Sequence, residues 1–147
     1  MSPRAALILG LLCIATSACT TQDMVTSTGK ARFADYPDSL VAALQRACDS
    51  PSQTFLRPTP SSVECREFLP PEPTAAIILT YDGTPENLPE LVIHFETRAD
   101  GSDFIVENEV FLHVPQKKGP ALKVRQSDVG LNRMLDALYT RAGGVPE

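Results

Sequence analysis

The side chains with the chemistry for metal binding or catalysis gather in one stretch of this chain. His94 and Glu96 share one face of an alternating segment, and Glu107 lies on the segment that follows. A histidine with two carboxylates could bind a metal ion, but a third strong ligand and a recognised ligand spacing are missing. A turn centred on Asp100 and Gly101 would instead place His94 opposite Glu107 as a cross-strand ion pair. We therefore predict this pair and no metal site.

Catalytic patterns are weaker still. Serines are abundant, yet no G-x-S-x-G motif accompanies them, and no residue pattern places a serine beside His94 or His113. Neither phosphate-binding glycine motif occurs. Glu107 and Glu109 lie two residues apart on one strand face, which is typical of solvated charge and not of acid–base catalysis. We predict a protein that is not an enzyme, without catalytic residues or a cofactor.

The N-terminus has the pattern of an export signal. Arg4 provides a positive charge, the stretch from residue 5 to 15 is apolar, and small residues precede Cys19. This order is typical of a secretory signal peptide. The apolar run is shorter than the roughly 20 residues that cross a bilayer. We therefore expect a cleaved signal over residues 1–18 and no permanent transmembrane helix here.

The residues before the cysteine carry a family resemblance. The stretch from Ile14 to Cys19, ending in Ser17 and Ala18, resembles a bacterial lipobox. The resemblance implies cleavage before Cys19 and attachment of acyl chains to it, which would anchor the protein in a membrane. Thr20 stands where an aspartate holds many such lipoproteins in the inner membrane, so the outer membrane, periplasmic side, is expected. The alternative is unlipidated cleavage after Ala18, which leaves a soluble periplasmic or secreted protein.

The remaining cysteines fit an exported protein. Of four cysteines, Cys13 would leave with the signal and Cys19 would carry lipid, so Cys48 and Cys65 remain. An oxidising periplasm permits a disulfide between them. The alternative is two buried free thiols, and a redox-active pair is disfavoured because there is no C-x-x-C spacing.

Charge limits the partners. The chain has a formal net charge of −5, and its one basic doublet, Lys117 and Lys118, precedes Gly119 and Pro120, as in a solvated turn. A nucleic-acid partner is not expected, because neutralising phosphates requires a basic surface. The expected partners are the membrane, through lipid on Cys19, and another envelope protein.

We therefore expect three parts in the sequence: the signal 1–18, a polar, lipid-attached flexible tether 19–34, and a single domain 35–147. The domain begins with a helix near residues 37–39, whose apolar residues Leu40, Leu44 and Cys48 recur on one face. Residues 51–73 hold six prolines and are predicted to form a surface loop, in which 62–68 adds a short edge strand. A polyproline ligand for another protein is the alternative interpretation of this loop.

The rest of the domain alternates as strands do. The sequence predicts a buried strand over 75–81, half-buried strands over 91–97 and 104–114 around a turn at 99–102, and a further strand in 121–126. A last helix follows a cap at Ser127 or Asp128 and ends at Gly143. The predicted fold is α+β, with an antiparallel meander of three to five strands packed against an N-terminal and a C-terminal helix.

Two apolar residues are predicted on the outward face of the second half-buried strand. Ile105 and Phe111 alternate there with acidic side chains. Such a patch can bind a protein partner, unless the first helix or the proline-rich loop covers it. We therefore expect a lipid-anchored, non-enzymatic binding or accessory module for another envelope component. The alternative is a periplasmic small-ligand-binding or hydrolytic domain with a pocket between sheet and helix.

Overall fold

One antiparallel sheet organises the computed structural model, which describes residues 29–126 and 128–147. Seven strands of the described chain form this sheet in the order β2–β3–β4–β5–β1–β7, and β6 pairs with β5. The predicted α+β class is confirmed, and the sheet is larger than the expected three to five strands. In chain order, the elements are β1 (Lys30–Phe33), α1 (Asp38–Ala47), β2 (Gln53–Thr59), β3 (Ser62–Phe68), α2 (Pro71–Thr80), β4 (Glu90–Asp100), β5 (Asp103–Val114), β6 (Leu122–Arg125), α3 (Val129–Arg141) and β7 (Val145–Pro146).

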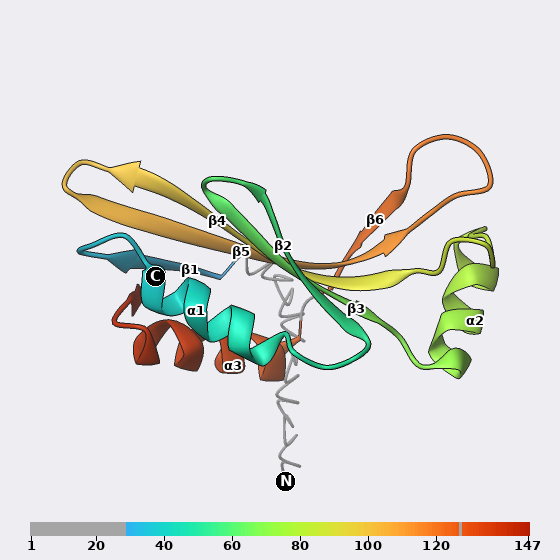
Figure 1. The fold of residues 1–147 in the computed structure, drawn as a ribbon, viewed down its shortest axis with the longest axis horizontal. Coiled ribbons are helices and arrows are strands. Elements are labelled where there is room, and N and C mark those ends of the chain that lie inside the picture. Colours follow the sequence, from blue (N-terminus) through green and yellow to red (C-terminus); the bar gives the residue numbers. More distant parts are fainter. Residues whose placement is uncertain (1–28, 127) are drawn as a thin grey trace, which may run out of the picture.

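The long hairpin of β4 and β5 runs along the whole sheet (Figure 1). Its register is continuous from Glu90 opposite His113 to Asp100 opposite Asp103. Gly101 has φ +66°, a conformation that suits glycine, so the predicted turn forms at Gly101 and Ser102. This turn lies one residue later than predicted, which shifts each cross-strand partner by two residues.

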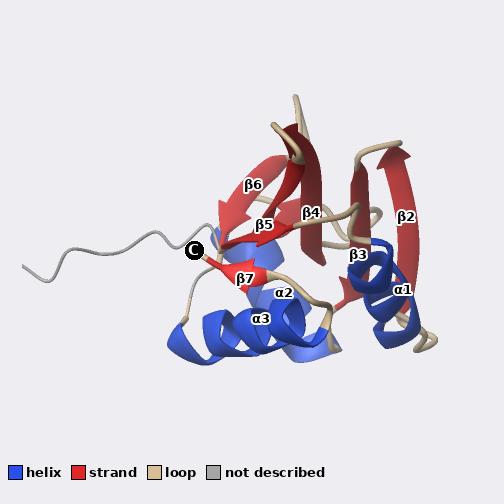
Figure 2. Cartoon of the chain, turned by 90° about the vertical axis from the view of Figure 1, so that its left-hand side faces the viewer, coloured by secondary structure: helices blue, strands red, loops and turns tan. Residues whose placement is uncertain are grey.

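Both helices that were expected to cover the sheet do so. Figure 2 shows α1 and α3 on the same face of the sheet, next to each other. Asp128 caps α3 by accepting a hydrogen bond from the Leu131 N–H at 2.8 Å, and Gly143 follows the helix with φ +89°. The core between the helices and the sheet is formed by apolar side chains, among them Phe33, Leu40, Leu44, Val63, Phe95, Val106, Val110, Leu135 and Tyr139.

Asn108 interrupts the apolar face of β5 for a reason that lies in α3. Tyr139 is fully buried, and its hydroxyl donates a hydrogen bond of 2.8 Å to Asn108 Oδ1. The Tyr139 ring also packs edge-on against Phe33 and Phe95. A buried hydroxyl needs a partner, and the buried amide supplies it. Burial raises the pKa of the Tyr139 hydroxyl far above its ordinary value of 10, with further contributions from Asp136 and Glu107.

Part of the predicted tether belongs to the sheet, which corrects the boundary between tether and domain. Residues 30–33 form β1, which pairs with residues 104–107 of β5 and, on its other side, with β7. Glu147 forms ion pairs with Lys30 and Arg32 at 2.8 and 2.9 Å, so the C-terminus and β1 hold each other. The predicted signal and residues 19–28 of the predicted tether lie outside the described residues.

The prediction of a proline-rich loop over 51–73 is wrong. This stretch forms the hairpin of β2 and β3 and the first turn of α2. Pro58 lies in β2 at the sheet edge, where a missing N–H is tolerated, and Pro71 and Pro73 lie in the first turn of a helix, where N–H groups have no helical partner. β3 has the predicted bounds, but it lies inside the sheet, between β2 and β4, and not at its edge.

The predicted buried strand over 75–81 is also wrong, because these residues belong to α2 and its end. A short apolar run fits a buried strand or a helix equally well, and the prolines before it supply a helix start. α2 lies at one end of the molecule, well away from α1 and α3 (Figure 1). Within the described residues, no helix has the length and apolar character needed to cross a membrane.

Candidate functional site

The predicted disulfide joins the helical layer to the sheet. Cys48 and Cys65 are bonded, with their Cα atoms 5.8 Å apart. Cys48 follows the last residue of α1, and Cys65 lies on the covered face of β3, opposite Ile93 of β4. The bond therefore ties the C-terminal end of α1 to the middle of the sheet. Cys13 and Cys19 lie outside the described residues.

His94 lies on the uncovered face of the sheet, but its partners differ from the prediction. It stands opposite Glu109 and Glu64 in the two neighbouring strands, not opposite Glu107. Its Nδ1 is 3.1 Å from Glu64 Oε1, and its Nε2 is 3.6 Å from Glu96. The later turn explains the change. It shifts the register of β5 against β4 by two residues, which changes each cross-strand partner and keeps every side chain on the same face of the sheet. The predicted pairing of His94 with Glu107 is therefore wrong.

The carboxylates around His94 are engaged by other groups. Glu107 faces Glu96 across the hairpin and pairs with Arg98 at 3.6 Å. Glu64 accepts hydrogen bonds from Arg66, which also bridges to Glu90. Among residues 29–126 and 128–147, no three His, Cys, Asp or Glu side chains are grouped so that they could hold a metal ion. The network links charges of β3, β4 and β5 across the uncovered face.

Glu109 has two cationic partners from β6. Lys123 and Arg125 both donate hydrogen bonds to its carboxylate. Burial alone would raise the pKa of Glu109, but these two hydrogen bonds outweigh it and lower the pKa below the ordinary 4.5. The Lys123 ammonium also lies 4.1 Å from the centre of the Phe111 ring. Short β6 thus presents its basic side chains to β5.

The two apolar residues expected to form a partner surface are buried within the chain. Ile105 is 1% exposed and Phe111 is 7% exposed. The first helix does not cover them, because both residues lie on the face of the sheet opposite α1 and α3. Ile105 lies between Arg32 and Arg98 in the sheet register, and Phe111 lies beside Lys123 and Val92. The aliphatic stems of long charged side chains can cover such residues.

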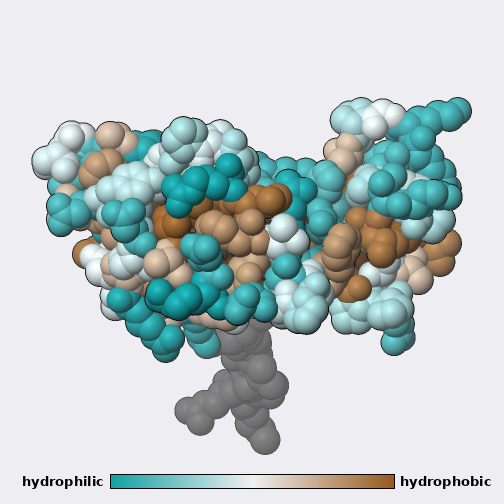
Figure 3. Space-filling model, in the orientation of Figure 1, coloured by the Kyte–Doolittle hydropathy of each residue, from teal (hydrophilic) through white to brown (hydrophobic). Residues whose placement is uncertain are grey.

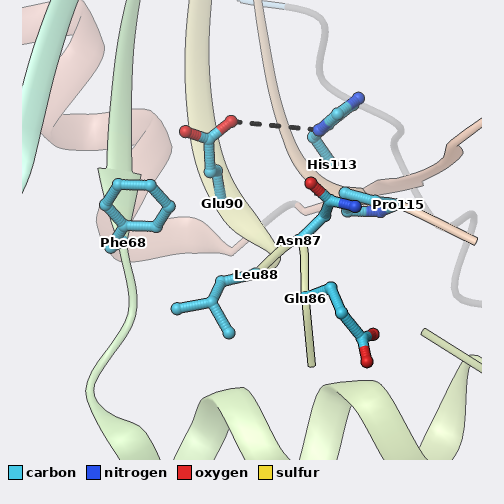
Figure 4. A pocket seen from close by; sticks show the side chains of 7 residues that line it. All are labelled: Phe68, Glu86, Asn87, Leu88, Glu90, His113 and Pro115. Atoms are coloured by element: carbon cyan, nitrogen blue, oxygen red, sulfur yellow. Dashed lines mark ion pairs between the residues drawn. The ribbon is translucent and has the colours of Figure 1, made fainter. Parts of the chain in front are cut away.

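His113 lies in an open pocket at the opposite end of the hairpin from its turn. The pocket has a volume of about 460 Å³. Figure 4 shows the Glu90 carboxylate directed toward the His113 ring, with 3.9 Å between Glu90 Oε2 and Nδ1. That distance is too long for a hydrogen bond, and within the described part of the chain the buried His113 Nδ1 has no hydrogen-bond partner. The lining consists of Phe68, Glu86, Asn87, Leu88, Glu90, His113 and Pro115.

The lining of this pocket mixes apolar and polar side chains. Glu90, which faces His113, also forms an ion pair with Arg66 at 3.2 Å. The pocket does combine an aromatic ring, an aliphatic side chain and convergent polar groups, which are the usual components of a recognition surface.

α2, at the same end of the molecule as this pocket, exposes a further apolar side chain. Leu79 of α2 is 85% exposed, and the pocket residues Phe68 and Leu88 are 47% and 44% exposed. Figure 3 shows brown, hydrophobic side chains gathered over this end of the molecule. We call Phe68, α2 and Leu88 together the α2 end. The α2 end was not predicted from the sequence, because the apolar run in α2 fits a buried strand equally well.

α2 is held at its C-terminal end. The Gly83 N–H donates to the Ile78 carbonyl at 2.9 Å, and a Cβ at Gly83 would lie within 3.3 Å of both Ile78 and Val114. Glycine therefore allows the end of α2 to approach the end of β5 closely. Thr74 is the buried residue of the helix, and its hydroxyl donates to the Leu69 carbonyl. The helix is positioned by its ends while its apolar side chains stay accessible.

Comparison with known proteins gives no match, either to family models, to curated proteins or to solved structures.

Proposed function

We propose that this protein is a lipid-anchored envelope protein that faces the periplasm, and that its domain binds another envelope protein through the α2 end. The observation that carries the binding role is that three large apolar side chains, Leu79, Phe68 and Leu88, are exposed at the same end of the molecule, and two of them, Phe68 and Leu88, line an open pocket. An apolar patch rimmed by polar residues is typical of a protein interaction site. Covering it contributes about 25 cal/mol for each Å² of apolar surface removed from water.

The anchoring role depends on the N-terminal sequence and is supported by the disulfide. A bonded Cys48–Cys65 pair fits an exported protein, because the cytosol keeps thiols reduced. Ten residues, 19–28, separate the predicted lipid site from the described domain. Fully extended, such a chain spans at most about 35 Å. The domain would therefore work close to the membrane surface.

Lipid attachment is tested by metabolic labelling. We expect radiolabelled palmitate to enter the full-length protein and to be absent from the Cys19→Ala variant. Cys13→Ala is the matched control and should be labelled like the unmodified protein. Equal labelling of the Cys19→Ala variant would reject lipid attachment at Cys19 and would favour the soluble periplasmic or secreted alternative.

The binding surface is tested by site-specific crosslinking in intact cells. A photoreactive amino acid in place of Leu79 should give a discrete protein adduct. The matched control is the same substitution at Val129, which is 66% exposed at the start of α3. Adducts of equal yield at both positions would reject a specific site at the α2 end. Adducts to lipid alone at Leu79 would replace the protein partner with the bilayer.

A further inference from the structure

A groove separates the two helices that cover the sheet. α1 and α3 run antiparallel and meet at one end, where the Ser39 hydroxyl donates a hydrogen bond of 2.7 Å to the Ala142 carbonyl. Beyond this contact, a concavity of about 220 Å³ opens between the helices above Ile93 and Phe95 of β4. A second concavity of about 450 Å³ shares Ala47, Leu138 and Arg141 with the first, so the two form one continuous groove.

The inner part of this groove is apolar. Leu44 and Ala47 of α1 form one wall, Leu138 and other residues of α3 form the other, and Arg141 is the one charged residue that lines it. Water in such a groove finds few hydrogen-bond partners, and an apolar ligand gains by replacing it. A peptide is a poor occupant, because its backbone N–H and C=O groups would meet a floor that offers none.

Two arginines stand at the rim. Arg46 of α1 and Arg141 of α3 both line the outer concavity. Among the described residues, neither guanidinium has a hydrogen-bond or ion-pair partner. Arg57 and Arg133 also lack one within this part of the chain, but neither of them lines the groove. A guanidinium binds a carboxylate or phosphate through two parallel hydrogen bonds. Unpaired arginines on an acidic protein therefore favour a ligand with an anionic head.

The disulfide holds the groove open in a defined shape. Cys48 directly follows Ala47 of the α1 wall, and it is bonded to Cys65, which lies opposite the floor residue Ile93. The wall and the floor are thus covalently joined at one end of the groove, and the Ser39 hydrogen bond joins the helices at the other. A site that is already formed before binding loses less free energy to ordering.

We propose that the groove between α1 and α3 binds the acyl chain of an anionic amphiphile, with its head group on Arg46 and Arg141. The chain lies along the apolar floor, and the head stays at the wet rim. This ligand site lies on the helical layer, apart from the α2 end, and does not depend on the partner proposed there. Its ligand class is single-chain lipids such as fatty acids.

The test uses the full chain with Cys19→Ala, so that no acyl group of its own competes. Calorimetric titration should show dodecanoate binding about tenfold more tightly than uncharged dodecanol, since one charge-assisted hydrogen-bonded contact is worth about this factor. In the Arg46→Gln/Arg141→Gln variant, the two ligands should bind equally. No binding of dodecanoate, or the same preference in the double variant, would overturn the proposal.

The location is tested by filling the groove. Ala47→Phe places a ring between the helices and should abolish dodecanoate binding, while Gln45→Phe, an exposed position two residues earlier on α1, should leave it unchanged. Met134→Trp fills the groove from the α3 side, and it replaces Ala47→Phe in this test if Ala47→Phe lowers the melting temperature. Binding that survives a folded groove-filling variant, or that is lost equally in Gln45→Phe, would overturn the proposed location.

Discussion

The two ends of the β4–β5 hairpin support helices in opposite ways. Toward the turn, α1 and α3 bury their apolar stripes, and Leu40, Leu135 and Tyr139 are almost fully enclosed. At the other end, α2 is just as apolar, yet Leu79 remains largely exposed. α1 and α3 stabilise the domain, whereas α2 presents an exposed apolar surface.

The cause lies in the order of residues within the helices. Apolar residues of α1 and α3 recur every three or four positions and so form one stripe that a sheet can cover. In α2, residues 75–79 are all apolar and therefore point in every direction around the helix axis. No single packing surface can cover all of them. A helix of this kind keeps apolar surface available for a partner.

The largest expected effect comes from opening the core at the covered end. Phe95→Ala should lower the free energy of unfolding by about 3–5 kcal/mol, because it leaves a cavity under α3. Phe68→Ala, at the α2 end, should cost less than about 1 kcal/mol because its ring is half-exposed. Chemical denaturation followed by circular dichroism measures both. Equal losses in the free energy of unfolding would show that Phe68 is part of the core, and the two ends of the hairpin would then not differ as described.

Removing the disulfide should have the next largest effect. The Cys48→Ala/Cys65→Ala variant should lose about 3 kcal/mol, as expected for a bond that closes a loop of 17 residues. The disulfide stabilises the end of the sheet that α1 and α3 cover, and not the α2 end. In the variant, molecules that remain folded should therefore still form the crosslink from position 79. Thermal melting with and without reductant gives the measurement. An unchanged melting temperature on full reduction would contradict a stabilising role for this bond.

The buried hydrogen bond of Tyr139 should matter less, but it gives a pH signature. Tyr139→Phe leaves Asn108 Oδ1 without its strongest partner and should cost about 1–3 kcal/mol at neutral pH. In the folded protein, the pKa of Tyr139 lies above its unfolded value of 10. Its stabilising contribution is therefore complete below pH 10 and decreases as the pH rises above it. The Tyr139→Phe variant should lack this alkaline decrease, and an identical decrease in both proteins would contradict the assignment.

The smallest expected effect is on the uncovered face of the sheet. Glu109→Gln should cost less than about 1 kcal/mol at neutral pH, because Lys123 and Arg125 are largely solvated. The folded pKa of Glu109 lies below 4.5, so the stabilisation is present above pH 4.5 and is lost as the pH falls through the folded value. The difference between the two proteins should vanish in strong acid. A difference that persists there would indicate a packing role for Glu109.

Local patterns were sufficient where a segment carried its own start, period and stop. α3 was predicted from a cap at Ser127 or Asp128, a helical stripe and Gly143, and each of these local signals operates within a few residues. The β4–β5 hairpin and β6 were likewise recognisable from alternation and turn residues. The cysteine pair followed from counting, and the structure confirms it.

Prediction failed where a segment acquires its structure from distant residues. β1 and β7 are too short to indicate strands by themselves. Lys30–Phe33 forms a strand because it pairs with an edge of β5, and Val145–Pro146 forms one because it pairs with β1. A one-residue change in the turn position moved the partner of His94 from Glu107 to Glu109. Burial of Ile105 and Phe111 depends on long side chains from neighbouring strands, which alternation along one strand does not reveal.

By itself, the sequence determined the α+β class, the hairpin, the last helix and the disulfide, because these depend on periodicity, capping and composition. The tertiary structure decided which apolar residues are accessible. It buried Ile105 and Phe111, exposed Leu79, and left a groove between α1 and α3 with two unpaired arginines at its rim. Exposure is a property of what packs against a side chain, and those neighbours are distant in the sequence.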